Sequence, residues 1–388
     1  MDSNIKKSLI ALAFGTLGLG VAEFVMMGIL PNIASSLGIT IPVAGHLISA
    51  YALGVCFGAI MLLMLRKYPM KNSLLLLVTI MAIGNGIAVI SPSYTVMLLA
   101  RFISGLPHGA YFGVASIVAS KIAQEGKESE AVAIMISGMT VANLFGVPLG
   151  TFISGILSWR LIFLFIVLWD ILTIFLIKRY VPYIAPLPDT GFLGQFKFLK
   201  SLAPWLILGA TMMGNGGAFC WYSYVTPMFT EVSGFVPEII TALMVLAGLG
   251  MVIGNMIGGK LSSFFYPGKV GAIFQGLMAI TLLGIFFLSP YKWAAVLLMC
   301  IVTLCLFAVS APQQFLIIKF APGGEMLGAA GIQIAFNLGN AIGAYLGGLP
   351  ITYGVGVRYS ALIASSIATL GFILFSLFNY LYQPKKSI

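Results

Sequence analysis

Charged side chains are scarce in this sequence: only 8% of its 388 residues are Asp, Glu, Lys or Arg, whereas 60% are hydrophobic. Ordinary soluble domains carry about 25% charged residues. Together with a mean hydropathy of +1.08, this shortage excludes a soluble globular protein. The apolar residues form long continuous runs rather than short alternating segments, which predicts membrane-spanning helices and not a membrane barrel.

Signatures of enzymes and of cofactor-binding proteins are also missing. The two histidines, His46 and His108, cannot form an HExxH zinc site, and neither a GxxxxGK[ST] loop nor a GxSxG motif occurs. We therefore expect no enzymatic activity, no metal and no cofactor. The net charge of +10 is not gathered on a soluble domain, so we expect no nucleic-acid partner.

The apolar runs predict twelve spanning helices, because roughly 20 apolar residues cross a bilayer. They lie near 8–30, 43–65, 73–90, 96–119, 131–157, 160–177, 203–225, 238–259, 269–288, 293–318, 326–349 and 357–381. A proline- and lysine-containing stretch, 181–201, interrupts them after the sixth. We expect an amino-terminal six-helix bundle over 1–180, a cytoplasmic linker over 181–201 and a carboxy-terminal six-helix bundle over 202–388.

Basic residues in the predicted loops indicate the orientation, because cytoplasmic loops are enriched in Lys and Arg. With a cytoplasmic amino terminus, the outer side receives three, Arg160, Lys292 and Arg358. The inner side receives sixteen, Lys6, Lys7, Arg66, Lys67, Lys71, Lys121, Lys127, Lys178, Arg179, Lys197, Lys200, Lys260, Lys269, Lys319, Lys385 and Lys386. This asymmetry predicts a multi-pass protein of a bacterial cytoplasmic (inner) membrane with both termini in the cytoplasm.

An internal repeat relates the two predicted bundles. The pairs Gly54/Gly250 and Gly58/Gly254 are offset by 196 residues, and Asn143/Asn337 by 194. Glycines also recur at GxxxG spacing within spans, which allows two helix backbones to approach closely. Tandem halves of parallel topology are typical of one large class of secondary transporters.

Three charged residues fall within predicted spans: Glu23 in the first, Arg101 in the fourth and Asp170 in the sixth. Intramembrane charges are costly and are functional candidates. His108 follows Arg101 by two helical turns, so Glu23, Arg101 and His108 form a candidate proton-coupling group. A permanent structural pair of Glu23 and Arg101 is the alternative, and Asp170 has no evident partner.

Amide and aromatic side chains in the second half are candidates for the lining of a substrate cavity. Such groups suit an uncharged polyhydroxylated or amphipathic ligand. Helix packing explains any single member equally well. The candidates are Asn215, Trp221, Tyr222, Gln313, Gln314, Gln333 and Asn337.

Several segments resemble the major facilitator superfamily, specifically the drug and sugar proton-antiporter group and its AraJ-type arabinose efflux permeases. The segments are GLGVAEF at 18–24, YALG at 51–54, RFISGLPHG at 101–109, SGMTVANLFGVPLGT at 137–151 and GAAGIQ at 328–333. The resemblance implies an all-α integral membrane protein of two pseudo-symmetric six-helix bundles. It also implies that the first, fourth, seventh and tenth spans line a central cavity that opens alternately to either side.

The resemblance further implies a proton-coupling role for Arg101 and an antiporter motif at Gly146, Pro148 and Gly150. The proline stands one residue later than in the family's GPxxGG pattern, and Thr151 replaces its final glycine. After Gly58, the loop motif of the superfamily lacks its usual acid.

These observations predict a monomeric secondary transporter that exports a sugar or a small amphipathic compound or drug by proton antiport. Its partners would be the substrate and the lipid bilayer. Uptake by symport or facilitation is one alternative. A non-transporting membrane sensor is another, which the lack of a recognisable output domain disfavours.

Overall fold

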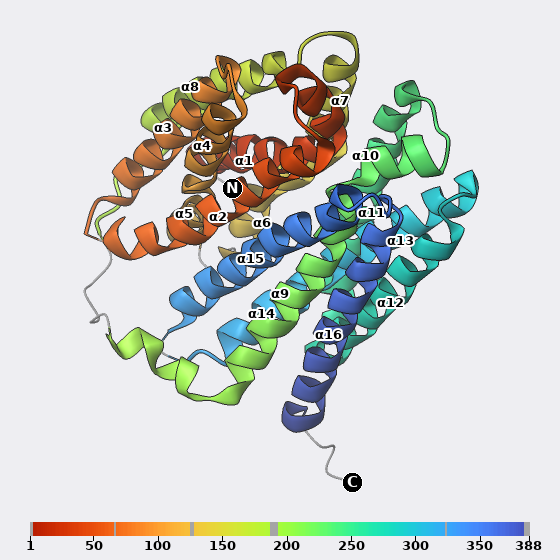
Figure 1. Cartoon of the computed structure of the whole chain (residues 1–388). Helices are drawn as coiled ribbons and strands as arrows, with labels where there is room; N and C mark the ends of the chain where they lie inside the picture. The colour runs from red at the N-terminus through yellow and green to blue at the C-terminus, as the bar shows by residue number, and fades with distance from the viewer. Residues whose placement is uncertain (1–2, 66, 125–127, 187–192, 323, 384–388) are drawn as a thin grey trace. The chain divides into compact units, whose positions relative to one another are not determined.

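The protein is described by a computed structural model that covers all residues except 1–2, 66, 125–127, 187–192, 323 and 384–388. Four basic residues used to predict the topology, Arg66, Lys127, Lys385 and Lys386, lie outside the described residues. In the described part of the chain, every regular element is helical (Figure 1). The chain forms two compact units, Met1–Asp189 and Thr190–Ile388, and the division falls within the stretch predicted as a linker.

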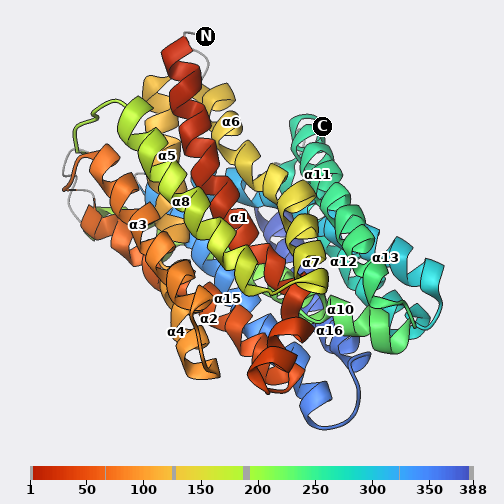
Figure 2. The ribbon, with the colours of Figure 1, turned by 90° about the horizontal axis from the view of Figure 1, so that it is seen from above.

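The first unit is built around α1, a 35-residue helix. Figure 2 shows α1 running between α8 on one side and α6 and α7 on the other, and α1 packs against all three. The elements of this unit are α1 (Ser3–Leu37), α2 (Ile41–Leu65), α3 (Met70–Val89), α4 (Tyr94–Gly105), α5 (Pro107–Ile122), α6 (Glu128–Val141), the π-helix η1 (Ala142–Gly146), α7 (Val147–Ile156) and α8 (Arg160–Tyr180).

The second unit is organised around α9, which packs against α15 and α16 (Figure 1). Its elements are η2 (Leu193–Lys200), α9 (Leu202–Tyr222), α10 (Val225–Pro227), η3 (Met228–Val232), η4 (Pro237–Ile239), α11 (Ile240–Phe264), α12 (Pro267–Leu288), α13 (Lys292–Ala308), α14 (Ser310–Lys319), α15 (Glu325–Thr352) and α16 (Tyr359–Tyr382).

Some predicted spans are interrupted helices. The fourth is divided into α4 and α5 at Leu106, because Pro107 has no N–H and cannot continue the hydrogen-bond ladder of α4. The fifth contains η1, and the tenth is divided between α13 and α14. The predicted seventh span stops at Tyr222 as α9, and short helical segments then continue to Val232.

Eleven helical stretches of the described residues are long and apolar enough to cross a membrane. The one predicted span that is not among them is the seventh, which corresponds to the 21-residue helix α9. Its mean hydropathy is lowered by Thr211, Asn215 and several glycines, residues that face the interior of the unit, where they are buried. Length therefore allows α9 to span, while its polar positions are accommodated by protein contacts rather than by lipid.

Glycines at GxxxG spacing hold helix pairs together within each unit. A Cβ atom at Gly58 of α2 would overlap the carbonyl oxygen of Leu106, which follows α4. Along α15, Cβ atoms on successive glycines would overlap carbonyl oxygens of α9, with Gly343 against Gly216 as the central contact. The repeat predicted from sequence thus marks close backbone packing inside the bundles.

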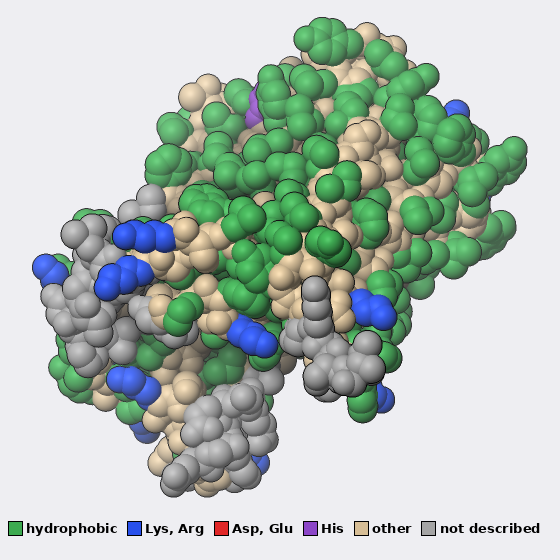
Figure 3. All heavy atoms as spheres, turned by 90° about the horizontal axis from the view of Figure 1, so that it is seen from below, with side chains coloured by type: hydrophobic (Ala, Val, Ile, Leu, Met, Phe, Trp, Pro, Cys, Tyr) green, Lys and Arg blue, Asp and Glu red, His purple; other side chains and the backbone are tan. Residues whose placement is uncertain are grey.

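The surface is largely apolar, as contact with lipid requires. Figure 3 shows hydrophobic side chains over most of the visible face. Large apolar residues such as Trp293, Ile280 and Phe175 are exposed to 84%, 70% and 60%. A water-soluble protein would cover such patches, so this surface supports the membrane assignment.

Candidate functional site

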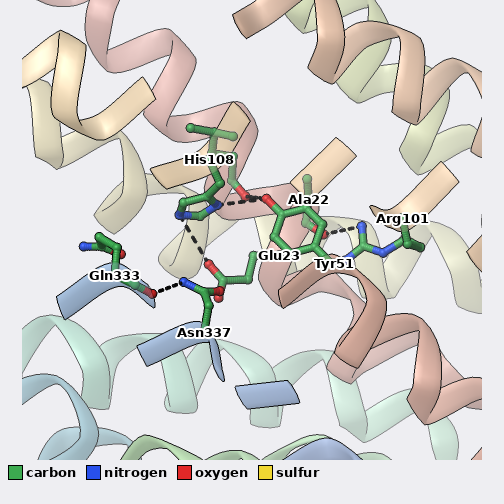
Figure 4. Close-up of polar contacts among 8 residues, drawn as sticks. Ala22, Glu23, Tyr51, Arg101, His108, Gln333 and Asn337 are labelled. Atoms are coloured by element: carbon green, nitrogen blue, oxygen red, sulfur yellow. Dashed lines mark hydrogen bonds and ion pairs between the residues drawn. The ribbon is translucent and has the colours of Figure 1, made fainter. Parts of the chain in front are cut away.

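Four polar side chains from four helices of the first unit meet in its interior (Figure 4). Glu23 comes from α1, Tyr51 from α2, Arg101 from α4 and His108 from the first turn of α5. The break at Leu106 and Pro107 places His108 at the start of a new helix, directly after the helix that carries Arg101. All four residues are at most 5% exposed, so any of their polar groups left without a partner is costly.

His108 contacts an acid and a phenol through its two ring nitrogens. Its Nε2 lies 3.7 Å from Oε2 of Glu23, and its Nδ1 lies 2.9 Å from the hydroxyl of Tyr51. The imidazole also stacks on Phe112, with ring centroids 5.3 Å apart. With the Nε2 tautomer, the imidazole presents an N–H to Glu23 and accepts a hydrogen bond from Tyr51.

Tyr51 can adapt to a change of charge on His108. Its hydroxyl also lies 3.5 Å from the backbone carbonyl oxygen of Leu19. When the imidazole is protonated, its Nδ1–H donates to the phenol oxygen, and the phenol proton can turn toward Leu19. The group can therefore hold an additional proton without leaving a donor facing a donor.

Arg101 is held beside this group by the backbone of α1 and by aromatic rings. Its Nη1 donates to the carbonyl oxygen of Ala22 at 2.8 Å, and its guanidinium lies 4.3 Å from the ring centroid of Tyr51. Within the described chain, Nε and Nη2 of Arg101 have no hydrogen-bond partner. Arg101 thus hydrogen-bonds the carbonyl of Ala22, the residue before Glu23, while the Glu23 carboxyl contacts His108. Glu23 and Arg101 remain close enough to interact electrostatically.

The segment predicted as the antiporter motif packs against the stretch of α1 that carries Glu23. A Cβ atom at Gly146 would overlap the side chain of Val21, and one at Gly150 would lie 2.5 Å from Cγ2 of Val25. Pro148, near the start of α7, is buried. The two glycines therefore let η1 and α7 approach α1 on either side of position 23.

Asn143 is a candidate that sequence reasoning used only as a marker of the repeat. It lies in the π-helix η1, is 3% exposed, and neither Oδ1 nor Nδ2 has a hydrogen-bond partner within the described residues. Single-turn π-helices occur frequently at functional sites. A signal was present in the sequence, since the repeat pairs Asn143 with the predicted substrate residue Asn337.

The predicted substrate residues all lie in the second unit, on the mutually packed helices α9, α14 and α15. Asn215 and Asn337 are each 1% exposed and donate from Nδ2 to the carbonyl oxygens of Thr211 and Gln333, four residues earlier. Their Oδ1 atoms lack partners among the described residues. Each side-chain amide is thus held in place by its Nδ2 hydrogen bond, and its Oδ1 remains available to accept one from a ligand.

The other substrate candidates divide by burial. Trp221, Tyr222 and Gln313 are at most 2% exposed, whereas Gln314 and Gln333 are half-buried. Nε1 of Trp221 and Nε2 of Gln313 have no hydrogen-bond partner in the described part of the second unit. The candidates therefore offer both donors and acceptors that a hydroxylated ligand could use.

Fold, surface and interior polar groups together define a multi-pass helical membrane protein with two bundles. Residues 12–333 match the Major Facilitator Superfamily, and the chain belongs to this family of membrane transporters. It is 47% identical to the protein named putative transporter AraJ of Escherichia coli K12, over 94% of this chain and 93% of that protein.

A further relative and a solved structure are also similar to this chain. The chain is 25% identical to a probable sugar efflux transporter of Helicobacter acinonychis, over 97% of this chain and 95% of that one. In structure, it resembles a bacterial homologue of the human lysosomal transporter Spinster in an inward-facing, unoccupied conformation. That match has a TM-score of 0.77 at 17% identity and covers 98% of both chains. The protein is thus a transporter and not an enzyme, and its fold is the major facilitator fold.

Proposed function

We propose that this transporter exports a sugar or a small amphipathic compound in exchange for protons, by alternating access. The observation that carries the proposal is the buried contact of Glu23 with His108, which is backed by Tyr51. A carboxyl, an imidazole and a phenol in series can accept, hold and release one proton.

In the proposed cycle, Glu23 binds the transported proton. While Glu23 is protonated, His108 is the Nδ1–H tautomer, whose unprotonated Nε2 faces the carboxyl. Release begins when Nε2 accepts the proton, which leaves a carboxylate next to an imidazolium. The Nδ1–H of that imidazolium donates to the phenol oxygen of Tyr51. Loss of the proton to water returns the imidazole to its neutral form and completes the step.

Arg101 keeps its charge throughout this cycle. Its link to the carbonyl oxygen of Ala22 fixes a cation next to the backbone of Glu23. A nearby positive charge in a poorly solvated interior stabilises the ionised carboxylate more strongly than it would in water. Arg101 would thereby help the carboxylate to form once the proton has left.

The substrate class rests on the side chains of the second unit. Buried oxygens of Asn215 and Asn337 and the indole N–H of Trp221 lack partners in its described residues, and a ligand with hydroxyl groups would supply them. The aromatic faces of Trp221 and Tyr222, 6.1 Å apart between ring centroids, suit an apolar ring face. An uncharged sugar or an amphipathic drug fits these groups better than a dication.

Export is supported by the motif at Gly146, Pro148 and Gly150 and by the name of the sugar efflux relative. The excess of Lys and Arg in the predicted inner loops supports cytoplasmic termini in a bacterial inner membrane. The two bundles contained in one chain support a monomeric transporter.

The test uses purified protein in proteoliposomes and the compound that most raises its melting temperature in a panel of sugars, nucleosides and antibiotics. We expect an inward proton gradient to drive the compound in the opposite direction. Glu23→Gln should abolish this coupled flux while the variant still melts cooperatively and still binds the compound. A wild-type flux that ignores the imposed gradient would contradict antiport, and a flux in the direction of the protons would favour symport.

A further inference from the structure

Asp170 is a fully buried acid that the proposed proton pathway does not use. It lies at mid-length of α8, with an exposed fraction of 0%, where α8 packs against both α1 and α3. Glycine at position 18 of α1 makes room for it, since a Cβ there would lie 3.1 Å from Oδ1 of Asp170. The carboxyl group is thus enclosed at the junction of three helices.

Asn85 of α3, also 0% exposed, is a polar neighbour of Asp170, and its side-chain amide can also donate to an ionised carboxyl group. Asn85 uses its Nδ2 to donate to the carbonyl oxygen of Met81 at 3.0 Å. Within the described chain, Oδ1 of Asn85 and both carboxyl oxygens of Asp170 have no hydrogen-bond partner. Three acceptor atoms therefore share one buried junction, and a single proton would convert one of them into a donor.

Among the described residues of α1, α3 and α8, the basic side chains lie toward the helix ends, and Arg101 of α4 binds the carbonyl oxygen of Ala22. On α8, Arg160 and Lys178 are ten and eight residues away, roughly 15 and 12 Å along the helix axis. The basic residue of α3, Lys71, donates to the backbone carbonyl of Lys178 at the exposed end of the helices. α7 carries no titratable side chain.

The remaining titratable groups nearby are neutral or already engaged. On α1, Glu23 contacts His108. The phenols close enough to sense a charge on Asp170 are Tyr51 and Tyr111, and the hydroxyl of Tyr111 donates to the carbonyl oxygen of Leu12 at 3.0 Å. Tyr51 faces His108. Neutrality at this junction therefore depends on Asp170 itself.

The corresponding junction in the second unit is filled without an acid. The 196-residue offset of the repeat relates Gly18 to Gly214 and Phe14 to Ala210. In the second unit, the amide of Gln275 lies against Gly214 and donates to the carbonyl oxygen of Ala210 at 3.0 Å. The related carbonyl oxygen, that of Phe14, accepts from Nε1 of Trp169 at 2.8 Å.

A neutral amide thus fills the related junction and satisfies the related carbonyl. In the first unit Trp169 already satisfies that carbonyl, so Asp170 is not needed for this contact. What the carboxyl adds to the junction is the ability to bind a proton.

We propose that Asp170 is a second proton-binding site, whose protonated carboxyl donates a hydrogen bond to Oδ1 of Asn85 between α1, α3 and α8. The bound proton keeps the junction of α1, α3 and α8 neutral in the folded protein. The site is separate from Glu23, and its occupancy does not depend on the proposed direction or substrate of transport.

The sequence allows a direct test, because it contains only three aspartates: Asp2, Asp170 and Asp189. Full-length protein labelled with ¹³C at the aspartate carboxyl carbon gives three resonances, which the variants Asp2→Asn and Asp189→Asn assign by elimination. We expect the Asp170 signal at the position of a protonated carboxyl at pH 7. Asn85→Leu removes the acceptor and should shift that signal while leaving it protonated.

A carboxylate position for Asp170 at pH 7 would overturn the proposal, as would a signal unaffected by Asn85→Leu. A carboxylate signal that responds to Na⁺ and not to pH would identify a cation site instead. Repeating the measurement in Glu23→Gln separates the two proposals. The Asp170 signal should persist there even if coupled transport is lost, so either proposal can fail without the other.

Discussion

Replacement of Tyr51 by Phe isolates one link of the proposed proton pathway. The hydroxyl of Tyr51 pairs with Nδ1 of His108 at 2.9 Å, whereas its ring supports the guanidinium of Arg101 at 4.3 Å. Tyr51→Phe removes the first contact and keeps the second. A buried imidazole nitrogen left without its partner costs about 1–3 kcal/mol, which corresponds to a change of roughly 5- to 150-fold in a rate or equilibrium constant.

The assay is proton-driven exchange in proteoliposomes, measured across a range of pH together with binding of the compound by thermal shift. We expect Tyr51→Phe to slow coupled exchange by about 5- to 150-fold and to alter its pH profile, with little change in binding. Tyr51→Leu, which removes the ring as well, should slow coupled exchange further and lower the melting temperature. If Tyr51→Phe catalysed exchange at the wild-type rate with an unchanged pH profile, the proposed proton transfer through His108 and Tyr51 would be contradicted.

Other predictions test packing, charge and binding separately. Gly258→Ala should lower the melting temperature, because its Cβ would overlap the carbonyl oxygen of Ala308. The matched control is the adjacent Gly259→Ala, whose Cβ meets nothing within 4 Å and which should stabilise α11 by up to about 1 kcal/mol. Asp170→Asn should raise the melting temperature relative to wild type increasingly as the pH rises above about 4, where an unfolded aspartate ionises. The sign follows because the unfolded wild-type chain would release a proton that the folded chain retains; a pH-independent difference would contradict it. Asn337→Leu should weaken ligand binding by about 1–3 kcal/mol through loss of a buried acceptor, measured by titration calorimetry, and unchanged affinity would remove Asn337 from the site.

Much of the fold could be predicted from the sequence because a backbone polar group without a hydrogen-bond partner is costly in lipid. Long apolar runs must be helical in lipid, and the glycine pairs that form the repeat also mark close helix contacts. The runs could not predict the stop at Tyr222 or the π-helix at Asn143. Both depend on tertiary contacts that hydropathy does not record.

The candidate site was predicted less completely. The cost of intramembrane charge singled out Glu23, Arg101 and Asp170, and helical spacing added His108. Residue spacing could not show that Arg101 binds a backbone carbonyl of α1. That contact depends on how the helices pack around the Arg101 side chain. Tyr51 was missed as a polar partner because aromatic residues are frequent in membrane helices, and only its position beside His108 distinguishes it.

Antiport through Glu23 is tested most directly by substrate-evoked proton release from the purified protein in weakly buffered detergent. We expect the identified compound to release protons from the wild-type protein when it is added, and Glu23→Gln to bind the compound without releasing any. Proton uptake on binding, or equal release from Glu23→Gln, would contradict it.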